Sequence, residues 1–339
     1  MAGEATEPAK QSLWERFSPY RGLLAFACVF VLGCFYTPRV GGTGLPIFLS
    51  WRTQLDILYE YCEYGLLATG MTLVILTAGI DLSVGSVLGC SATLFALLTI
   101  GKGWSVPAAI AAVVLFGLAA GTINGLLIAR FRMQPFVATL AMMTAARGLA
   151  IRISGGHTVA PAAMPWYKLQ ADTPPFFRWI SQSLPGIAIK PAALIFLVSI
   201  LIMAVLVSRS AFGRKLYAIG GNEEAALLSG IAVGRVKIIA YALCAGFAAL
   251  AGVINACRLD FGDPQSGVSF ELDAIAAVVI GGTSLAGGRG GMLYTLVGVL
   301  IIAYITKILS LNAVPLESRM IVQAAMILVA VLIQRQKRS

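Results

Sequence analysis

The sequence predicts an all-α polytopic membrane protein with about ten transmembrane helices. Of its 339 residues, 58% are hydrophobic and only 12% are charged, about half the charged fraction that is usual in a soluble domain. The mean hydropathy is +0.86. Several apolar runs approach or exceed the ~20 residues that a helix needs to cross a bilayer. The 36 glycines are typical of helices that approach one another closely.

The apolar runs define ten predicted spans, which together form one transmembrane domain over residues 22–334. In order they are 22–36, 57–79, 82–100, 105–129, 135–153, 191–208, 236–257, 272–287, 291–309 and 319–334. Residues 1–21 are polar, and no convincing small-residue cleavage site follows the first apolar run, so we expect a retained tail. Residues 335–339 form a second tail. Because ten is even, both tails lie on the same side.

Charged residues favour an orientation in which the N- and C-termini are cytoplasmic. The inner loops then hold 14 basic and six acidic residues, a net charge of +8, and the outer side holds 11 basic and nine acidic residues, a net charge of +2. Basic residues near span ends concentrate on the cytoplasmic side. This orientation places loop 209–235 inside and loop 154–190 outside. The orientation also accounts for the net positive charge of the chain, so this charge does not indicate a nucleic-acid partner.

The inner loop contains a polar segment, 213–231, that predicts a short helix over about 223–229. Asn222 is a favourable N-cap, Glu223 and Glu224 suit the positive end of a helix dipole, and Gly230 is a favourable terminator. A short helix outside the bilayer is suited to contact with a soluble partner. The candidate contact residues are Gly221, Asn222, Glu223, Glu224, Ala225, Leu228 and Ser229.

Four polar side chains lie at or near bilayer depth, where such residues are costly and commonly functional. We take them as candidates for a translocation path or its gate: Asp81, Glu63, Asn124 and Asp273. For Asp81 two interpretations stay open, a cap on a helix that begins at Leu82 and a direct part in gating. Asn124 either pairs within the bundle or faces a water-filled path. It adjoins a glycine stripe at positions 117, 121 and 125, which favours close helix packing.

The outer end of the second predicted span is rich in acids and tyrosines. Glu60 and Glu63 are three residues apart, as are Tyr61 and Tyr64, so each pair is expected to share one helix face. These side chains suit the hydroxyls and the apolar faces of a sugar. The alternative is an interfacial tyrosine belt with two hydrated acids.

Two further segments are unusual for simple spans. Segment 274–290 has a short apolar run followed by glycines, so it forms either a broken helix that lines a cavity or a flexible loop. The outer loop 154–190 is rich in proline and aromatic residues, including Trp166, Tyr167 and Phe177. Aromatic side chains outside the membrane are expected on the headgroup layer or against a partner.

The sequence disfavours catalysis within the chain. No Gly-x-x-x-x-Gly-Lys-Ser/Thr phosphate-binding motif occurs, and His157 is the single histidine. No nucleophile, base and orienting group stand out together. We therefore expect no enzyme active site, no cofactor and no metal site in this chain. The six cysteines lie in or beside apolar segments and are interpreted as small hydrophobic residues.

Several segments closely resemble the permease subunits of bacterial ribose-, xylose- and galactofuranose-type ABC sugar importers. They are GMTLVILTAGIDLSVGSV at 70–87, YAIGGNEEAA at 217–226 and ELDAIAAVVIGGTSLAGGRG at 271–290, together with PFVATLAMMTAARG at 135–148. The resemblance runs in order from about residue 57 to residue 334. It does not extend to loop 154–190, and the acid-rich stretch 59–64 departs from the less polar family pattern.

The resemblance implies a ten-span permease of the bacterial inner membrane that carries a monosaccharide. It implies a second permease subunit, as a homodimer or a heterodimer, two cytoplasmic ATPase domains that bind ATP and Mg, and a periplasmic sugar-binding protein. Residues 220–229 would be the coupling helix that docks on the ATPase. An ion-coupled secondary transporter of a small polar solute is the alternative, disfavoured because few ionisable residues lie within the spans.

Overall fold

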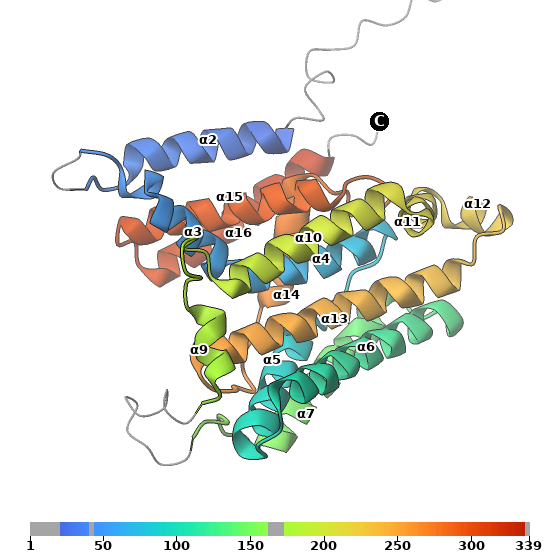
Figure 1. The fold of residues 1–339 in the computed structure, drawn as a ribbon. Helices are drawn as coiled ribbons and strands as arrows, with labels where there is room; N and C mark the ends of the chain where they lie inside the picture. Colours follow the sequence, from blue (N-terminus) through green and yellow to red (C-terminus); the bar gives the residue numbers. More distant parts are fainter. Residues whose placement is uncertain (1–20, 41–43, 162–172, 336–339) are drawn as a thin grey trace, which may run out of the picture.

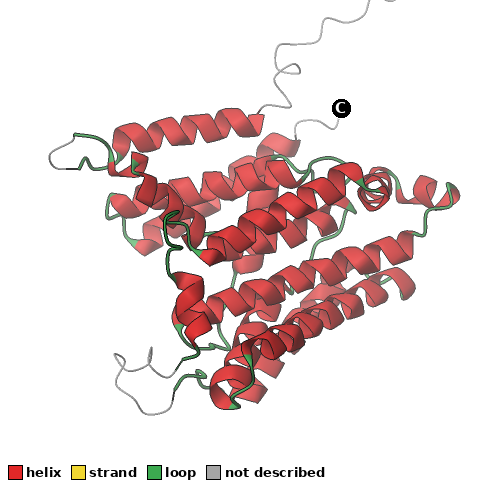
Figure 2. Ribbon diagram, in the orientation of Figure 1, coloured by secondary structure: helices red, strands yellow, loops and turns green. Residues whose placement is uncertain are grey.

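The computed structural model describes residues 21–40, 44–161 and 173–335, which form a bundle of helices (Figure 1). In this part of the chain β-structure is limited to two isolated bridges, Arg39 with Pro46 and Val159 with Gly262, and the ribbon is otherwise helix and loop (Figure 2). The all-α prediction is confirmed for these residues. The predicted tails, 1–21 and 335–339, lie almost wholly outside the described residues.

The described helices follow one another through short connections. In chain order they are α2 (Arg21–Tyr36), η2 (Ile47–Leu49), α3 (Trp51–Glu60), α4 (Cys62–Leu76), α5 (Val84–Ala96), η3 (Leu97–Gly101), α6 (Val106–Arg130), α7 (Pro135–Ser154), α9 (Pro175–Ser181), α10 (Pro191–Arg209), α11 (Ala211–Gly221), α12 (Glu223–Leu228), α13 (Val233–Leu259), α14 (Phe270–Gly281), α15 (Met292–Leu311) and α16 (Leu316–Arg335).

Six of the described helical segments are long and apolar enough to cross a membrane. They are Val84–Gly101, Val106–Arg130, Pro135–Ser154, Pro191–Arg209, Val233–Leu259 and Met292–Leu311. The segments Gly22–Tyr36 and Cys62–Leu76 are apolar but shorter. The chain is therefore a multi-pass membrane protein.

Helix α13 is the centre of the packing. It has 27 residues and packs along α6, α5 and α4. The glycine stripe of α6 makes the closest approach, because a Cβ added at Gly117 would lie 2.6 Å from the carbonyl oxygen of Ala245 and one at Gly125 would lie 2.6 Å from the Cα of Ile238. The prediction that this stripe serves helix packing is confirmed.

The prediction of one continuous span over 57–79 is wrong for its first residues. The helix breaks at Tyr61 (φ −106°, ψ 8°), so α3 ends before it and α4 begins after it. Every residue of the 15-residue helix α4 except Tyr64 is buried. At 1.5 Å per residue α4 is about 22 Å long, shorter than the ~30 Å hydrocarbon core. It is a helix enclosed by other helices.

The predicted span 272–287 is also short in the structure. Helix α14 has 12 residues and ends at Gly281, which corresponds to about 18 Å of helix. A glycine-rich turn over 282–291 follows it, with Gly282, Gly287, Gly288 and Gly290 at positive φ. Of the two interpretations of this segment, the short helix is the one that the structure supports.

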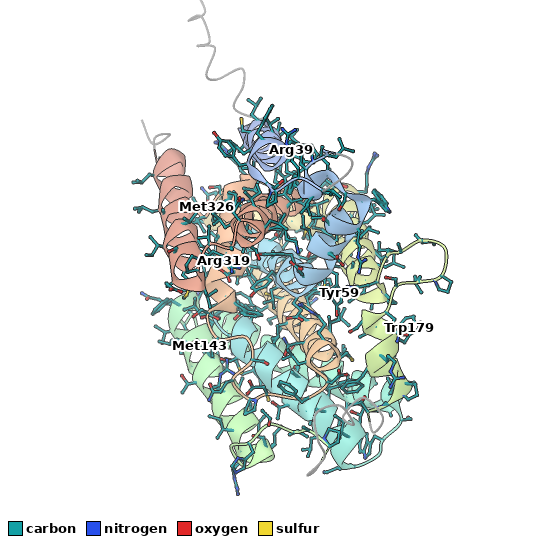
Figure 3. The ribbon with its side chains drawn as sticks, turned by 90° about the vertical axis from the view of Figure 1, so that its left-hand side faces the viewer. Arg39, Tyr59, Met143, Trp179, Arg319 and Met326 are labelled. Carbon is teal, nitrogen blue, oxygen red and sulfur yellow. The ribbon has the colours of Figure 1, made fainter. Side chains whose placement is uncertain are left out.

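The bundle has two distinct ends. Helix α12 lies at the right of Figure 1, the first turn of α2 and the last turn of α16 are the ends of these helices that point toward that side, and α9 lies at the left. We call these the α12 end and the α9 end. Figure 3 views the molecule from the α9 end, where Tyr59 and Trp179 are labelled.

Part of the aromatic loop belongs to the protein core. Phe177 of α9 is fully buried and stacks on Phe95 of α5, with 5.4 Å between ring centroids. The expectation that the loop aromatics contact headgroups or a partner is therefore wrong for Phe177, because α5 covers it. Trp179 is 49% exposed. Trp166 and Tyr167 lie outside the described residues.

Candidate functional site

The short helix predicted over 223–229 is present as α12, Glu223–Leu228. The Oδ1 atom of Asn222 accepts a hydrogen bond from the backbone N–H of Ala225 at 2.9 Å, and Glu223 and Glu224 occupy the first turn. Gly230 follows the helix with a φ of +80°, a conformation that favours glycine. The predicted N-cap residue, acidic first turn and terminating glycine are therefore all present in the structure.

The exposed surface of α12 has an acidic first turn, Glu223 and Glu224, and two leucines at its end. Leu228 is 84% exposed and Leu227 is 61% exposed, while Ala226 is buried against the bundle. An ion pair of 2.7 Å between Lys237 and Glu223 fastens the start of α12 to α13. A fixed helix that presents adjacent leucines outside the bundle is suited to contact with another protein.

Sequence reasoning missed α11, the helix that precedes α12. Its start is capped by Ser210, whose Oγ accepts from the backbone N–H of Gly213 at 3.2 Å. The signal available in the sequence was this serine, placed directly after an arginine-terminated apolar run. Gly221, which we expected beside the contact surface, is the last residue of α11, and the space around it is open.

Helix α11 rests on the inner turns of the bundle. The backbone N–H of Gly288 donates to the carbonyl oxygen of Leu76 at 3.1 Å, and the Tyr217 hydroxyl donates to the carbonyl oxygen of Gly290 at 2.9 Å. Burial raises the pKa of Tyr217, which keeps this donor protonated. A Cβ at Gly220 would collide with the Leu76 carbonyl. Helix α11 therefore packs against both α4 and the glycine-rich turn 282–291, and α12 contacts α11.

Asp81 and Asn124 are brought together by Ser83. The backbone N–H and the hydroxyl of Ser83 donate to Asp81 Oδ1 at 2.9 and 2.6 Å, and Asn124 Nδ2 donates to Ser83 Oγ at 3.1 Å. All three residues are fully buried. Among the described atoms, Asp81 Oδ2 and Asn124 Oδ1 have no hydrogen-bond partner.

The capping interpretation of Asp81 holds for its hydrogen bond, because its Oδ1 accepts from the backbone N–H two residues on, while the helix begins two residues later than expected. Helix α5 begins at Val84, and Ser83 is its N-cap residue. The hydrogen bond to Asp81 fixes the turn before the helix. The amide of Asn124 is paired within the bundle, as one of its two interpretations expected.

Glu63 lies toward the α9 end and is 3% exposed. Its Oε1 is 2.9 Å from Arg258 Nη1, and its Oε2 accepts from Asn255 Nδ2 at 2.9 Å. Glu60 forms a separate ion pair of 2.6 Å with Lys307. The expectation that Glu60 and Glu63 share one helix face is wrong, because the break at position 61 puts them on different helices.

A cavity of about 480 Å³ opens beside Glu63. It is formed by the break between α3 and α4, the end of α13 and the segment that leads into α14. Its walls combine the residues Glu60, Tyr61, Glu63, Tyr64, Asn255, Arg258, Leu259, Gln265, Ser266, Gly267, Val268 and Phe270. The volume lies within the ~300–1,000 Å³ range of small-molecule sites.

Asp273 belongs to neither group. Its Oδ1 accepts a hydrogen bond from Gln323 Nε2, which joins α14 to α16. The four predicted polar residues thus occupy three places: the buried Asp81 and Asn124 pair, the Glu63 cavity, and the contact between α14 and α16. The partners of Glu63 were not found from the sequence, because Asn255 and Arg258 lie almost 200 positions away.

Together these features define a helical membrane transport subunit. Short helices, glycine-rich turns and buried polar groups within the bundle are the parts from which transporters build a path across the bilayer. Helix α12, held outside the bundle, leaves Leu227 and Leu228 exposed.

The chain belongs to the family described as branched-chain amino acid transport system / permease component, whose profile matches residues 54–331. It is similar to the ribose import permease protein RbsC of Escherichia coli (strain K12), with 40% identity over 295 residues that cover 86% of this chain and 88% of that protein. The ribose import permease protein RbsC of Bacillus subtilis (strain 168) is 43% identical over 292 residues, 86% of this chain and 87% of that protein.

The similarity extends to a second group of permeases. The xylose transport system permease protein XylH of Escherichia coli (strain K12) is 34% identical over 354 residues, which cover 90% of this chain and 89% of that protein. No solved structure matches the chain significantly.

Proposed function

We propose that this chain is the membrane-spanning permease subunit of an ATP-driven bacterial importer, and that it forms the translocation path for a monosaccharide by alternating access. The observation that carries the proposal is its similarity, over nearly the full length of both proteins, to permeases named for ribose and xylose. The capped helix α12 supports the ATP-driven part of the proposal.

In this proposal the permease has ten spans and cytoplasmic termini. The predicted spans correspond to α2, α4, α5, α6, α7, α10, α13, α14, α15 and α16. The start of α2 and the end of α16 both point toward the α12 end of the bundle (Figure 1), as an even number of spans requires. The excess of basic residues in the inner loops supports a cytoplasmic location for this end.

The proposed coupling element is α12 with its flanking residues. Asn222 holds the helix start, and Leu228 is its most exposed apolar side chain. In the proposal α12 docks on a cytoplasmic ATPase, and that ATPase binds the ATP and Mg. A movement of α12 would then be transmitted through α11 to α4 and to the turn 282–291. The hydrogen bonds from Gly288 to Leu76 and from Tyr217 to Gly290 support this route.

The proposed path has an outer and an inner group of polar residues. Glu63 lies at the α9 end, which this topology places in the periplasm. Asp81 and Asn124 lie nearer the α12 end, and Asp273 lies between α14 and α16. Unpartnered atoms on Asp81 and Asn124 support a role beyond static packing, because an unsatisfied buried polar group is costly.

The proposed assembly is a complex in the inner membrane. It contains this chain, a second permease subunit that is either a copy or a homologue, the cytoplasmic ATPase and a periplasmic sugar-binding protein. Purification of the tagged full-length chain from its native membrane in mild detergent tests the assembly. We expect an ATPase to co-purify in stoichiometric amount, and recovery of the intact chain without any ATPase would contradict the proposal.

A further inference from the structure

We propose that the cavity beside Glu63 is a binding site for a neutral monosaccharide at the periplasmic mouth of the path. This inference rests on the proposed function, and it adds a defined site within the permease chain itself. Its support comes from the charge balance, the exposed chemistry and the position of the cavity.

The two carboxylates that line the cavity are paired with cations, while Asp273, which interacts electrostatically with the wall residues Tyr61 and Tyr64, is hydrogen-bonded by the neutral Gln323. Glu63 is paired with Arg258 at 2.9 Å, and Glu60 is paired with Lys307 at 2.6 Å. Two carboxylates are thus matched by two cations. At either pair a charged ligand would have to break the ion pair to find a partner, whereas a neutral polar ligand meets these groups as ready hydrogen-bond donors and acceptors.

One buried acceptor in the cavity wall has no partner. Asn255 is 6% exposed and gives its Nδ2 to Glu63 Oε2 at 2.9 Å, which fixes the orientation of the amide. Its Oδ1 has no hydrogen bond among the described residues. Leaving a buried acceptor unsatisfied costs about 1–3 kcal/mol. Because this oxygen is itself buried, a ligand hydroxyl reaches it, and removes that cost, only when the surrounding wall shifts.

Part of the cavity wall is aromatic. Tyr64 lies against Phe270 with 4.4 Å between ring centroids, and Tyr61 lies 5.5 Å from Tyr64. Aromatic rings offer apolar faces beside polar edges. Aromatic rings together with amide, carboxylate and guanidinium groups in one cavity wall match a molecule with an apolar C–H face and a rim of hydroxyls. A monosaccharide has both features.

The cavity is open at the end where the sugar would arrive. Val268 lies on its wall and is 57% exposed, so a side chain there is accessible from outside. The Glu63, Arg258 and Asn255 cluster forms the floor. The site is therefore placed to receive a sugar released by a periplasmic binding protein.

The test uses chemical blocking of the assembled importer in proteoliposomes. Val268→Cys is treated with a bulky, membrane-impermeant methanethiosulfonate, and uptake of radiolabelled D-ribose and D-xylose is compared before and after treatment. Ile187→Cys is the matched control, because Ile187 is 63% exposed and does not line the cavity. The parent chain, with its own six cysteines, receives the same treatment.

We expect labelling at position 268 to reduce uptake about tenfold, equivalent to about 1.4 kcal/mol, while ATPase stimulation by the loaded binding protein is retained. The control and the parent should keep their uptake. Complete labelling at 268 without loss of uptake would overturn the site. An equal loss in the Ile187→Cys control, or loss of ATPase stimulation, would also overturn it, since the label would then act on docking. If the untreated parent takes up no sugar, the proposed function itself fails.

Discussion

Replacing Leu228 by arginine is the sharpest test of the coupling surface. The side chain is 84% exposed at the end of α12 and belongs to no part of the bundle core. Burying a leucine side chain contributes about 1.5–3 kcal/mol. If the ATPase covers this exposed surface, Leu228→Ala should lose roughly 1.5–2.5 kcal/mol, which corresponds to an affinity about 10- to 70-fold weaker.

Leu228→Arg should weaken docking further, because it also places a charge in an apolar contact. Folding should be unaffected, since no described side chain packs on the exposed face of Leu228. The assay measures binding of the purified ATPase to the permease in nanodiscs, together with sugar uptake and ATP hydrolysis. Ile187→Arg, which places the same charge at a comparably exposed position in the outer loop, is the control.

The outcome that refutes the reasoning is specific. If Leu228→Arg binds the ATPase with parental affinity and couples hydrolysis to uptake, α12 is not the coupling element. If the control loses binding to the same extent, the loss reflects damage to the permease and gives no support to the docking surface.

Two further predictions concern topology and the path. Single cysteines at Leu227 and Ile187, in a cysteine-free background, should react with an impermeant maleimide from opposite sides of the membrane; reaction of both in intact cells would contradict the orientation. Alanine at Glu63, Asn124 and Asp273 should each lower uptake while insertion and ATPase association persist, because each removes a polar group from the proposed path. Normal uptake by all three variants would place the path elsewhere.

Local chemistry made α12 predictable from the sequence. Its cap, its acidic first turn and its terminal glycine act within a few residues, so the pattern 222–230 contains what determines the helix. The α6 glycine stripe was predictable for a similar reason, because a spacing of four residues places the glycines on one face. The sequence did not show, however, that α13 is the helix that packs against this stripe.

The errors arose where distant parts of the chain decide the outcome. The stretch 57–64 contains no glycine or proline that would mark the break at position 61, and its acids and tyrosines are all compatible with a continuous helix. The carboxylate of Glu63 was visible, but Arg258 and Asn255 reach it only through the packing of α13 on α4. Burial of Phe177 likewise depends on α5.

The candidate site was therefore only partly predictable. The sequence identified Asp81 and Asn124 separately, and it gave no indication that Ser83 connects them. It also named Asp273 without Gln323, its partner on α16. Single polar residues at membrane depth can be recognised from the sequence, whereas their pairing requires the arrangement of the helices.

The most direct test of the central proposal is the energy source of uptake. The assembled importer, reconstituted with its binding protein and ATPase, should take up ribose or xylose only when ATP is hydrolysed on the ATPase side. Uptake should persist when ionophores collapse all ion gradients, and it should stop when the ATPase is inactivated. Uptake that follows an imposed proton or sodium gradient without ATP would contradict the account and would identify the chain as a secondary transporter.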